Sequence, residues 1–353
     1  MNFLFVMKHR GNAGNIHALA DYMRVAERYG HRVALFGEPQ PWLPDLAFSM
    51  DVHAFDKVVY LFESEIYRVG RLHEVALLGH FSREDRMVLD MDGMYNPVVV
   101  LDDYDRNHGS ESSWIEWKAH LDSLSARIKK PVHAPVEPLA HGGPLTFYGY
   151  DDALEIAPED APEKVFDIVY VGHNWWRWRE LEREVFPALE RVRDRFGRIA
   201  LIGLWWDGPP PEGADAGDER AFASEPGVLD RLHIEALPSV MYHEVVRTMS
   251  RSKINIFTQR PLLHHLRHLT LKYFEIFYAD TIPLLMLDPD HAERVYGPAG
   301  RELALPGRVS ETLTDALQRP DHYRGLVSEV RGHLARHHSY DQRIEELVSA
   351  FKD

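Results

Sequence analysis

The segment between Arg260 and Glu275 has the residue types best suited to binding chemistry. Its leading cations are Arg260, Arg267 and Lys272, and they surround the expected start of a helix. Free backbone amides, the helix dipole and cationic side chains all favour a phosphate at such a place. Glu275 follows one turn later, and an ionised carboxylate can accept hydrogen bonds from both hydroxyls of a sugar diol. The segment therefore predicts a site for a nucleotide or a nucleotide-sugar.

A second group of candidate donor ligands follows the apolar run at residues 165–172, which predicts a buried strand. Gly172 ends this strand, so His173 and Asn174 are expected at the carboxyl edge of a sheet, where ligands of open α/β sheets bind. These three residues are candidates for contact with a diphosphate or the transferred sugar. The alternative is a turn that packs between helix and sheet.

The first loop of the chain offers candidates for a second substrate. Gly14 permits a close backbone approach, and Asn15 and His17 stand at the start of the first expected helix. We interpret Gly14 and Asn15 as acceptor-binding residues and His17 as a catalytic contact or base. The alternative is a capping turn with a solvent-exposed histidine.

Asp103 lies where another expected strand, residues 97–103, reaches the same edge. A carboxylate there could deprotonate an attacking hydroxyl group, so Asp103 is the second catalytic candidate. One alternative is a Mg²⁺ or Mn²⁺ site that also uses the neighbouring Asp102, Asp105 and His108. The other alternative is a turn in which these residues cap helices. We assign no metal ligands.

Strand and helix patterns alternate along the whole chain, which predicts parallel sheets covered by helices. A helix is expected to begin at Thr270, whose hydroxyl could cap it. The stretch 131–163, rich in Pro, Gly, Ala and acids, predicts a crossing between two domains. Further strands are expected at 3–7, 32–36, 57–62, 86–91, 198–206, 232–237 and 252–257, and helices at 64–78, 112–128, 180–197, 238–252 and within 320–352.

The C-terminal third resembles the donor half of GT-B glycosyltransferases. The resemblance rests on a helix containing Phe274 and Glu275, a small-residue turn and an apolar strand. It is most similar to the CgeB-like (spore maturation type) group, which also ends in an aromatic and basic tail. The matching residues are Ala279, Asp280, Thr281, Ile282, Pro283, Leu284 and Leu285, followed by His338, Ser339, Tyr340, Asp341, Gln342 and Arg343.

This resemblance implies an α/β fold of two Rossmann-like domains with a cleft between them. Residues 1–160 would bind the acceptor, residues 161–335 the donor, and a helix at 336–353 would cross back to the first domain. The resemblance further implies that Glu275 binds the ribose of the donor. Many retaining members carry a second Glu eight residues earlier, where this chain has Arg267, so the stereochemistry stays open.

The implied activity is a metal-independent hexosyltransferase (class EC 2.4) that needs no cofactor besides its nucleoside-diphosphate sugar, with UDP as the first nucleotide to consider. The acceptor would be a small molecule or a glycan, in carbohydrate or natural-product biosynthesis. Two alternatives stay open, a non-hydrolysing nucleotide-sugar epimerase and a degenerate GT-B binding module.

The composition limits the remaining function classes. The chain has 353 residues, a formal charge of −15 and no cysteine. The negative charge disfavours nucleic-acid partners, and the absence of cysteine excludes disulfides and thiol catalysis. No run of about 18 apolar residues predicts a membrane span. With no recognisable signal peptide, the cytoplasm is the expected location, and a homodimer stays open.

Overall fold

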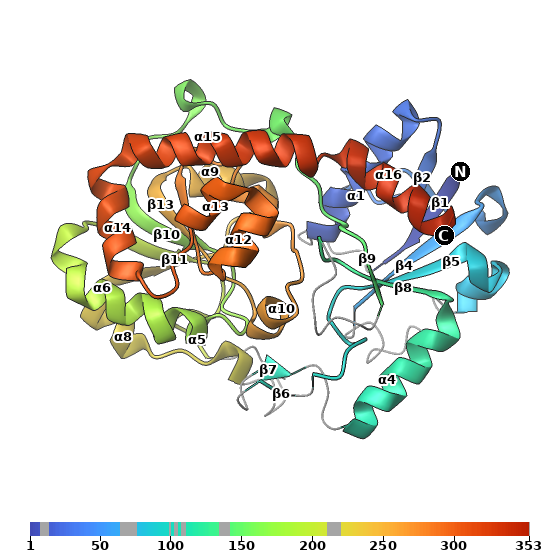
Figure 1. The fold of residues 1–353 in the computed structure, drawn as a ribbon, viewed down its shortest axis with the longest axis horizontal. Coiled ribbons are helices and arrows are strands. Elements are labelled where there is room, and N and C mark those ends of the chain that lie inside the picture. The colour runs from blue at the N-terminus through green and yellow to red at the C-terminus, as the bar shows by residue number, and fades with distance from the viewer. Residues whose placement is uncertain are drawn as a thin grey trace.

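The first half of the chain builds a parallel seven-stranded sheet in the order β3-β2-β1-β4-β5-β8-β9 (Figure 1). Its central strands are mostly apolar, as expected for strands with both faces buried. The strands are β1 (Asn2–Val6), β2 (Arg32–Phe36), β3 (Phe48–Ser49), β4 (Lys57–Phe62), β5 (Arg86–Asp90), β8 (Arg127–Lys130) and β9 (Gly143–Pro144). The computed structural model describes residues 1–7, 14–63, 76–98, 100–101, 105–106, 111–133, 142–209 and 220–352.

The second half builds a parallel five-stranded sheet in the order β12-β11-β10-β13-β14. In each sheet the strand that comes first in its half lies in the interior, between the second strand of that half and a later one. At such a switch point the connections leave in opposite directions and open a crevice at the carboxyl ends of the strands. The strands are β10 (Phe166–Val171), β11 (Ile199–Ile202), β12 (Ile234–Leu237), β13 (Ser252–Phe257) and β14 (Ile282–Leu285).

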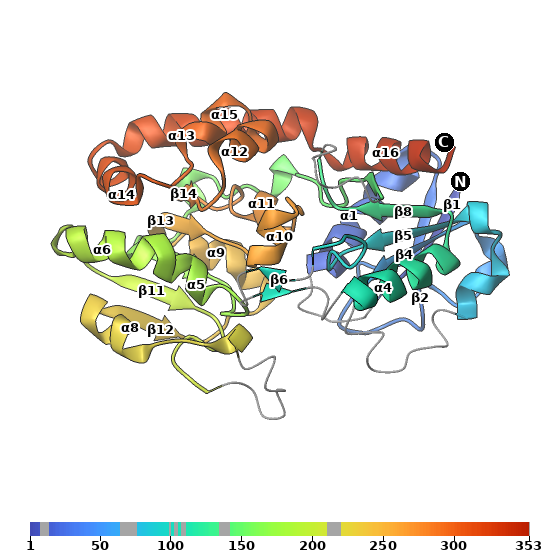
Figure 2. The same cartoon turned by 60° about the horizontal axis from the view of Figure 1, so that its bottom comes forward.

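Helices cover both sheets, and the short α10 and α11 lie on the side of the second half that faces the first (Figure 2). The α-helices are α1 (Gly14–Arg28), α4 (Glu111–Leu124), α5 (Trp178–Glu180), α6 (Phe186–Val192), α8 (Pro226–Leu232), α9 (Val245–Met249), α10 (Pro261–His265), α11 (Lys272–Glu275), α12 (Pro289–Tyr296), α13 (Pro298–Glu302), α14 (Val309–Gln318), α15 (Pro320–His337) and α16 (Tyr340–Lys352). A π-helical turn (Leu181–Val185) joins α5 to α6, and the 3₁₀ turns are Val52–Ala54, Leu78–His80, Arg83–Asp85, Asp152–Leu154, Pro158–Asp160, Arg193–Arg195, Arg220–Phe222 and η9 (Tyr242–Glu244).

The last two helices connect the halves. Helix α15 runs along the second half, and α16 continues from it onto the first half beside α1 (Figure 1). The chain crosses at His338, whose carbonyl oxygen accepts a hydrogen bond from the Tyr150 amide at 2.7 Å. The Phe351 ring near the end of α16 lies 5.8 Å from that of Phe3 in β1, centroid to centroid. Two Rossmann-like halves and a C-terminal helix that crosses back confirm the predicted fold class.

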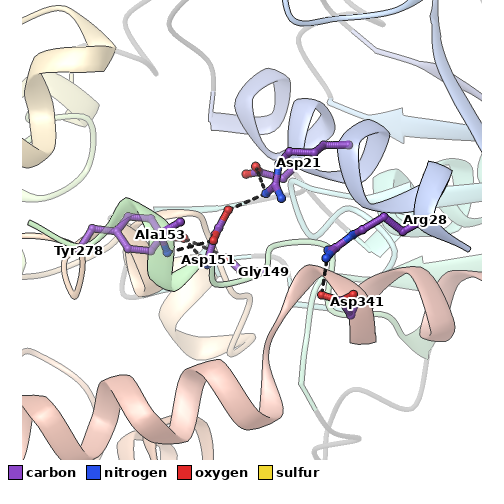
Figure 3. Close-up of polar contacts among 8 residues, drawn as sticks. Asp21, Arg28, Gly149, Asp151, Ala153, Tyr278 and Asp341 are labelled. Carbon is purple, nitrogen blue, oxygen red and sulfur yellow. Dashed lines mark hydrogen bonds and ion pairs between the residues drawn. The ribbon is translucent and has the colours of Figure 1, made fainter.

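Polar contacts from the outer face of α1 tie the first half to both crossing segments (Figure 3). Arg24 forms an ion pair with Asp151 at 2.6 Å, and Arg28 forms one with Asp341 of α16 at 3.2 Å. The amide of Asp151 also donates to the Tyr278 hydroxyl of the second half at 3.1 Å. Helix α1 therefore contacts both connections between the halves. The expected domain boundaries at residues 160 and 335 stay predictions.

Two expected elements of the first half differ in the structure. The strand expected at 97–103 does not join the main sheet in the part described, where β6 (Val100–Leu101) pairs antiparallel with β7 (Asp105–Arg106). The strand that pairs with β5 on the side away from β4 is β8, which the sequence assigned partly to a helix over 112–128. The sequence of β8 is RIKK, so its charged residues hid it.

Three predictions for the second half were too simple. The helix expected at 180–197 is interrupted by the π-helical turn just before Pro187, which has no amide hydrogen to continue the helical bonds. The helix expected at 238–252 is confined to η9 and α9. Thr270 provides no side-chain cap, since Leu271 precedes α11.

The helix expected at 64–78 falls mostly outside the described residues. Within the described ranges no helix has the length and apolar character to cross a membrane.

Candidate functional site

Two loops at the carboxyl edge of the second sheet approach each other backbone to backbone. Gly172 follows β10 with φ +154°, and a Cβ atom there would lie 2.8 Å from the Tyr170 hydroxyl oxygen. Gly203 follows β11 with φ +157°, and a Cβ atom there would lie within 2.1 Å of the Gly172 carbonyl oxygen. Only glycine fits at both positions. The Trp206 Nε1–H donates a hydrogen bond to the Gly172 carbonyl oxygen at 2.9 Å, which joins the two loops.

Lys272 and Glu275 form a nearly buried ion pair at this edge. The Lys272 ammonium donates to the carbonyl oxygen of Val171, the last residue of β10, at 2.6 Å. It also lies 3.4 Å from Glu275 Oε2, and the side chains are 21% and 6% exposed, respectively. Among the described residues no group donates to the other carboxylate oxygen of Glu275. The pair thus offers one cation and one unoccupied carboxylate oxygen at the switch point of the sheet.

His173 is held as a neutral imidazole beside this pair. Its Nδ1 accepts a hydrogen bond from the Leu204 amide at 3.0 Å, so the ring proton lies on Nε2. Desolvation, followed by the charges of Arg177 and Lys272, lowers the pKa of His173. The ring therefore remains a hydrogen-bond donor at neutral pH and is suited to a phosphate or hydroxyl oxygen.

Asn174 stabilises the loop and is not exposed at an open surface. Its side chain is buried, and its Nδ2 donates to the carbonyl oxygens of Trp205 and Ala223 at 2.7 and 3.0 Å. Its Oδ1 accepts from the amide of Trp178, the first residue of α5, at 3.0 Å. Direct contact of Asn174 with a donor stays a prediction, whereas its role in shaping the loop is visible.

The two candidate arginines lie in different surroundings. The Arg260 guanidinium lies over the Trp175 ring, 5.7 Å from its centroid, and so belongs to the loop that carries His173. Arg267 adopts φ +54°, a left-handed conformation rare for a non-glycine residue. Burial lowers the pKa of His291 to about 3, and the positive charge of Arg267 is the second largest cause of this shift. The structure therefore groups Arg260 with the donor candidates and Arg267 with His291.

The expected helix dipole is small in the structure. Helix α10 spans five residues and α11 spans four, so few peptide dipoles add up at either start. The cationic side chains must supply most of the attraction for an anion.

The start of α1 contacts the second half next to the Lys272–Glu275 pair. A Cβ atom on Gly14 would lie 3.1 Å from the Cβ of Leu271, the residue before Lys272. One turn later the His17 ring stacks on Tyr242 of η9, with ring centroids 3.4 Å apart. Gly14, an acceptor candidate, and His17, a catalytic candidate, thus lie against the second half of the chain.

Asn15 joins a polar network that the sequence did not reveal. Its Nδ2 donates to Glu63 Oε1 at 2.6 Å, and its Oδ1 accepts from the Tyr148 hydroxyl. Glu63 follows the buried strand β4 directly, which is the signal that could have identified it. Tyr242 gave no such signal, because it precedes a short helix. Asp103 lies outside the described residues.

A buried cluster of ionisable groups, Asp90, Lys130 and His268, lies where the halves meet. Asp90 accepts from the amides of Met94 and Tyr95 at 3.0 and 2.7 Å, and burial raises its pKa to about 6. Burial lowers the pKa of Lys130 to about 8 and that of His268 to about 3. Each of these groups is therefore less ready to carry charge than in water.

Comparison with known proteins identifies the architecture. Residues 179–349 match the family model described as glycosyl transferase-like. No curated protein sequence matches the chain. Among solved structures, the chain is similar to sucrose-phosphate synthase from Thermosynechococcus elongatus, with 11% identity, a TM-score of 0.62 and coverage of 100% of this chain and 98% of that one.

Two glucosyltransferases are similar over the same extent. T4 phage β-glucosyltransferase in complex with UDP-glucose shows 11% identity, a TM-score of 0.59 and coverage of 99% of both chains. An α-glucosyltransferase in complex with UDP and a 13-mer DNA shows 12% identity, a TM-score of 0.58 and coverage of 100% of this chain and 99% of that one. These likenesses show that the chain has the GT-B fold.

Proposed function

We propose that this chain, which has the GT-B fold and a glycosyl transferase-like C-terminal half, transfers a hexose from a nucleoside-diphosphate sugar to a hydroxyl acceptor. The observation that carries the proposal is the Lys272–Glu275 pair at the carboxyl end of β10. A diphosphate needs a cation there, and a ribose needs a carboxylate acceptor. Both stand together at the switch point, where ligands of such sheets bind.

On the donor side each candidate has a proposed role. Glu275 accepts hydrogen bonds from the ribose hydroxyls, while Lys272 and Arg260 balance the charge that develops on the leaving diphosphate. His173 donates through Nε2, and Gly172 allows the backbone to approach the phosphates. Charge stabilisation by side chains makes the proposed transfer independent of a metal. Asn174 and Arg267 complete the proposed donor set, Asn174 by holding the loop.

On the acceptor side, Gly14 and Asn15 are proposed to bind the hydroxyl substrate, with His17 and Asp103 as catalytic contacts. One similar structure contains DNA. The formal charge of −15 of this chain disfavours a polyanionic acceptor. We therefore propose a small molecule or a glycan as the acceptor, and the cytoplasm as the place of reaction.

Nucleotide binding tests this proposal. The melting temperature would be measured with UDP, GDP, dTDP, CDP and UDP-glucose for the wild type and for Glu275→Gln. A nucleotide at 100 times its Kd stabilises the folded state by about 2.7 kcal/mol, so one nucleotide should raise the melting temperature clearly. UDP is the first expectation, since two of the similar structures hold UDP or UDP-glucose.

The matched control is Asp321→Asn, which removes the acid of an exposed ion pair with Arg324 on α15. This control should respond to the nucleotide like the wild type, whereas Glu275→Gln should respond much less. A chain that responds to no nucleotide would contradict the proposal. Conversion of UDP-N-acetylglucosamine to an epimer without an acceptor would indicate the epimerase instead.

A further inference from the structure

Glu63 is a carboxylate at the carboxyl edge of the first sheet, beside the start of α1. It follows β4 directly and is partly exposed. Strand β4 pairs with β1, and α1 follows β1, so Glu63 lies beside the start of α1. Asn15 in the first turn of α1 donates its Nδ2 to Glu63 Oε1 at 2.6 Å. The positive end of the α1 dipole favours a negative charge at this place.

The Asn15 amide that donates to Glu63 is itself held in one orientation, because Glu63 and Tyr148 bind its two ends. An ionised carboxylate only accepts hydrogen bonds, so the amide group of Asn15 must present its NH₂ to Glu63. The amide oxygen then faces Tyr148, whose hydroxyl donates to it. Burial, followed by the charges of Glu63 and Asp92, raises the pKa of Tyr148, so the phenol keeps its proton. The three side chains form a directed chain from Tyr148 to Glu63.

The same end of α1 lies against the donor residues. Gly14, next to Asn15, meets Leu271, the residue before Lys272. His17 stacks on Tyr242, and burial followed by the charge of Glu275 raises the pKa of that tyrosine. The edge of the first sheet that carries Glu63 therefore meets the second half next to the Lys272–Glu275 pair.

Two other described acids, Asp90 and Asp92, lie near this edge, and Asp90 is poorly placed for proton transfer. Asp90 is completely buried, and its two oxygens accept the amides of Met94 and Tyr95. One face of the His17 ring is covered by Tyr242. Glu63 combines partial exposure with a hydrogen bond from the oriented Asn15 amide, which suits a proton acceptor.

We propose that Glu63 is the general base that takes the proton of the acceptor hydroxyl, an inference that rests on the proposed function. The hydroxyl oxygen forms a bond to the anomeric carbon of the sugar while its proton moves to the Glu63 carboxylate. The bond from the anomeric carbon to the diphosphate oxygen breaks, and the diphosphate leaves with the electron pair beside Lys272 and Arg260. Asn15 and Tyr148 are positioning residues for the base.

With the base on the first half and the donor bound to the second half, the acceptor hydroxyl attacks the anomeric carbon from the side opposite the leaving diphosphate. The transfer then inverts the anomeric configuration. This agrees with Arg267 standing where many retaining relatives carry a glutamate.

Hydrolysis of the donor with water as the acceptor tests the proposal. Release of nucleoside diphosphate would be followed with UDP-glucose, UDP-N-acetylglucosamine, GDP-mannose, dTDP-glucose and CDP-glucose. For the donor cleaved fastest, Glu63→Gln should lower the rate by about 10²-fold or more and remove the acid limb of the pH–rate profile. The Kd of the nucleoside diphosphate, measured by calorimetry, should change less than about twofold.

Positioning variants and a control separate catalysis from folding. Asn15→Ala and Tyr148→Phe should slow hydrolysis and leave nucleotide affinity unchanged. The control is Glu155→Gln, because Glu155 also accepts a tyrosine hydroxyl, that of Tyr150 at 2.7 Å, but lies at the crossing between the halves. The control should hydrolyse the donor like the wild type.

The outcomes distinguish the base from the donor site. With α-linked UDP-glucose, proton NMR should show β-glucose first, before mutarotation. Initial release of α-glucose, an unchanged rate in Glu63→Gln, or nucleotide binding without any hydrolysis would each overturn the role of Glu63 and leave the donor site standing. Failure of the wild type to bind any of the nucleoside diphosphates would instead overturn the proposed function.

Discussion

The imidazole ring of His17 and the phenol ring of Tyr242 lie face to face, with centroids 3.4 Å apart and planes inclined by 5°. His17 belongs to α1 of the first half, and Tyr242 belongs to η9 of the second half. Aromatic pairs contribute on the order of 1 kcal/mol beyond the area they bury, and a face-to-face pair without offset lies at the low end of that range. The contact closes the crevice beside the Lys272–Glu275 pair.

Loss of this stacking should open the molecule. Tyr242→Ala removes the ring, so the free energy of the closed arrangement should rise by about 1 kcal/mol. Small-angle X-ray scattering should then give a larger radius of gyration than for the wild type. Tyr242→Phe keeps the ring and is the control. Equal radii for Tyr242→Ala and Tyr242→Phe would show that the stacking does not hold the halves together.

Removing one partner of the Lys272–Glu275 pair should lower the free energy of unfolding more than replacing both partners does. Lys272→Met leaves the carboxylate of Glu275 buried without its cation, which should lower the free energy of unfolding by about 3 kcal/mol. Adding Glu275→Gln removes that charge, so the double variant should recover much of the loss. Urea denaturation of the single and double variants measures the coupling. Additive effects of the two substitutions would argue against an interacting pair.

A steric contact between the halves can be measured with two glycines of similar backbone conformation. Gly93 has φ +72°, and a Cβ atom there would lie within 2.4 Å of Leu266 Cδ1 in the donor half. Gly30 has φ +70°, and a Cβ atom there would meet no other atom within 4 Å. Both alanine variants carry the left-handed cost of about 1 kcal/mol, and Gly93→Ala should add about 1–3 kcal/mol from the clash.

The difference between these two variants therefore isolates the contact between the halves. Adding Leu266→Ala to Gly93→Ala should relieve the clash, which thermal or urea unfolding would detect. A Gly93→Ala variant as stable as Gly30→Ala would mean that Leu266 yields without cost.

Buried histidines should make the fold sensitive to acid. Burial is the main reason why the pKa of His338 lies at about 2 and that of His268 at about 3, both below the ordinary value of 6.5. A lowered pKa in the folded state means that the stabilisation is complete above pH 6.5. It is lost as the pH falls from 6.5 toward these values, because the unfolded chain binds the protons first. At pH 5 each histidine should have lost about 2 kcal/mol of its contribution.

His338 offers the clearest variant, because its ring packs against aromatic neighbours. The His338 ring lies 4.6 Å from His133 and 5.6 Å from Phe274, centroid to centroid. His338→Phe should therefore reduce the drop in the urea midpoint between pH 7.5 and pH 5. Asp90 acts in the opposite direction, since its raised pKa favours the protonated folded state. An unchanged drop in His338→Phe would assign the acid sensitivity to other groups.

The sequence predicted the parallel strands because they depend on local patterns, whereas the crossing of the C-terminal helix was implied by the resemblance to GT-B proteins. Apolar runs such as FLFVM and KVVYLF form strands wherever both faces are covered. The strand β8 was hidden, since Lys130 is buried by tertiary packing that its local sequence does not show. Likewise, the crossing at His338 follows from contacts far apart in the chain.

Some residues of the candidate site were also predictable from local sequence, whereas others were not. Lys272 and Glu275 are neighbours on one helical turn, and the structure shows the ion pair that their spacing allows. Gly172 and His173 were expected from the end of β10. Glu63 and Tyr242 become part of the site only when the two halves meet, which no local pattern shows. Roles in binding and catalysis stay predictions for all of these residues.

A crystal structure of the protein with UDP-glucose would test the donor site most directly. We expect the ribose hydroxyls within hydrogen-bonding distance of the Glu275 carboxylate, and the diphosphate beside Lys272 and Arg260 at the carboxyl end of β10. A nucleotide bound elsewhere, or bound here with Glu275 away from the ribose, would show that Glu275 and Lys272 do not form the donor site.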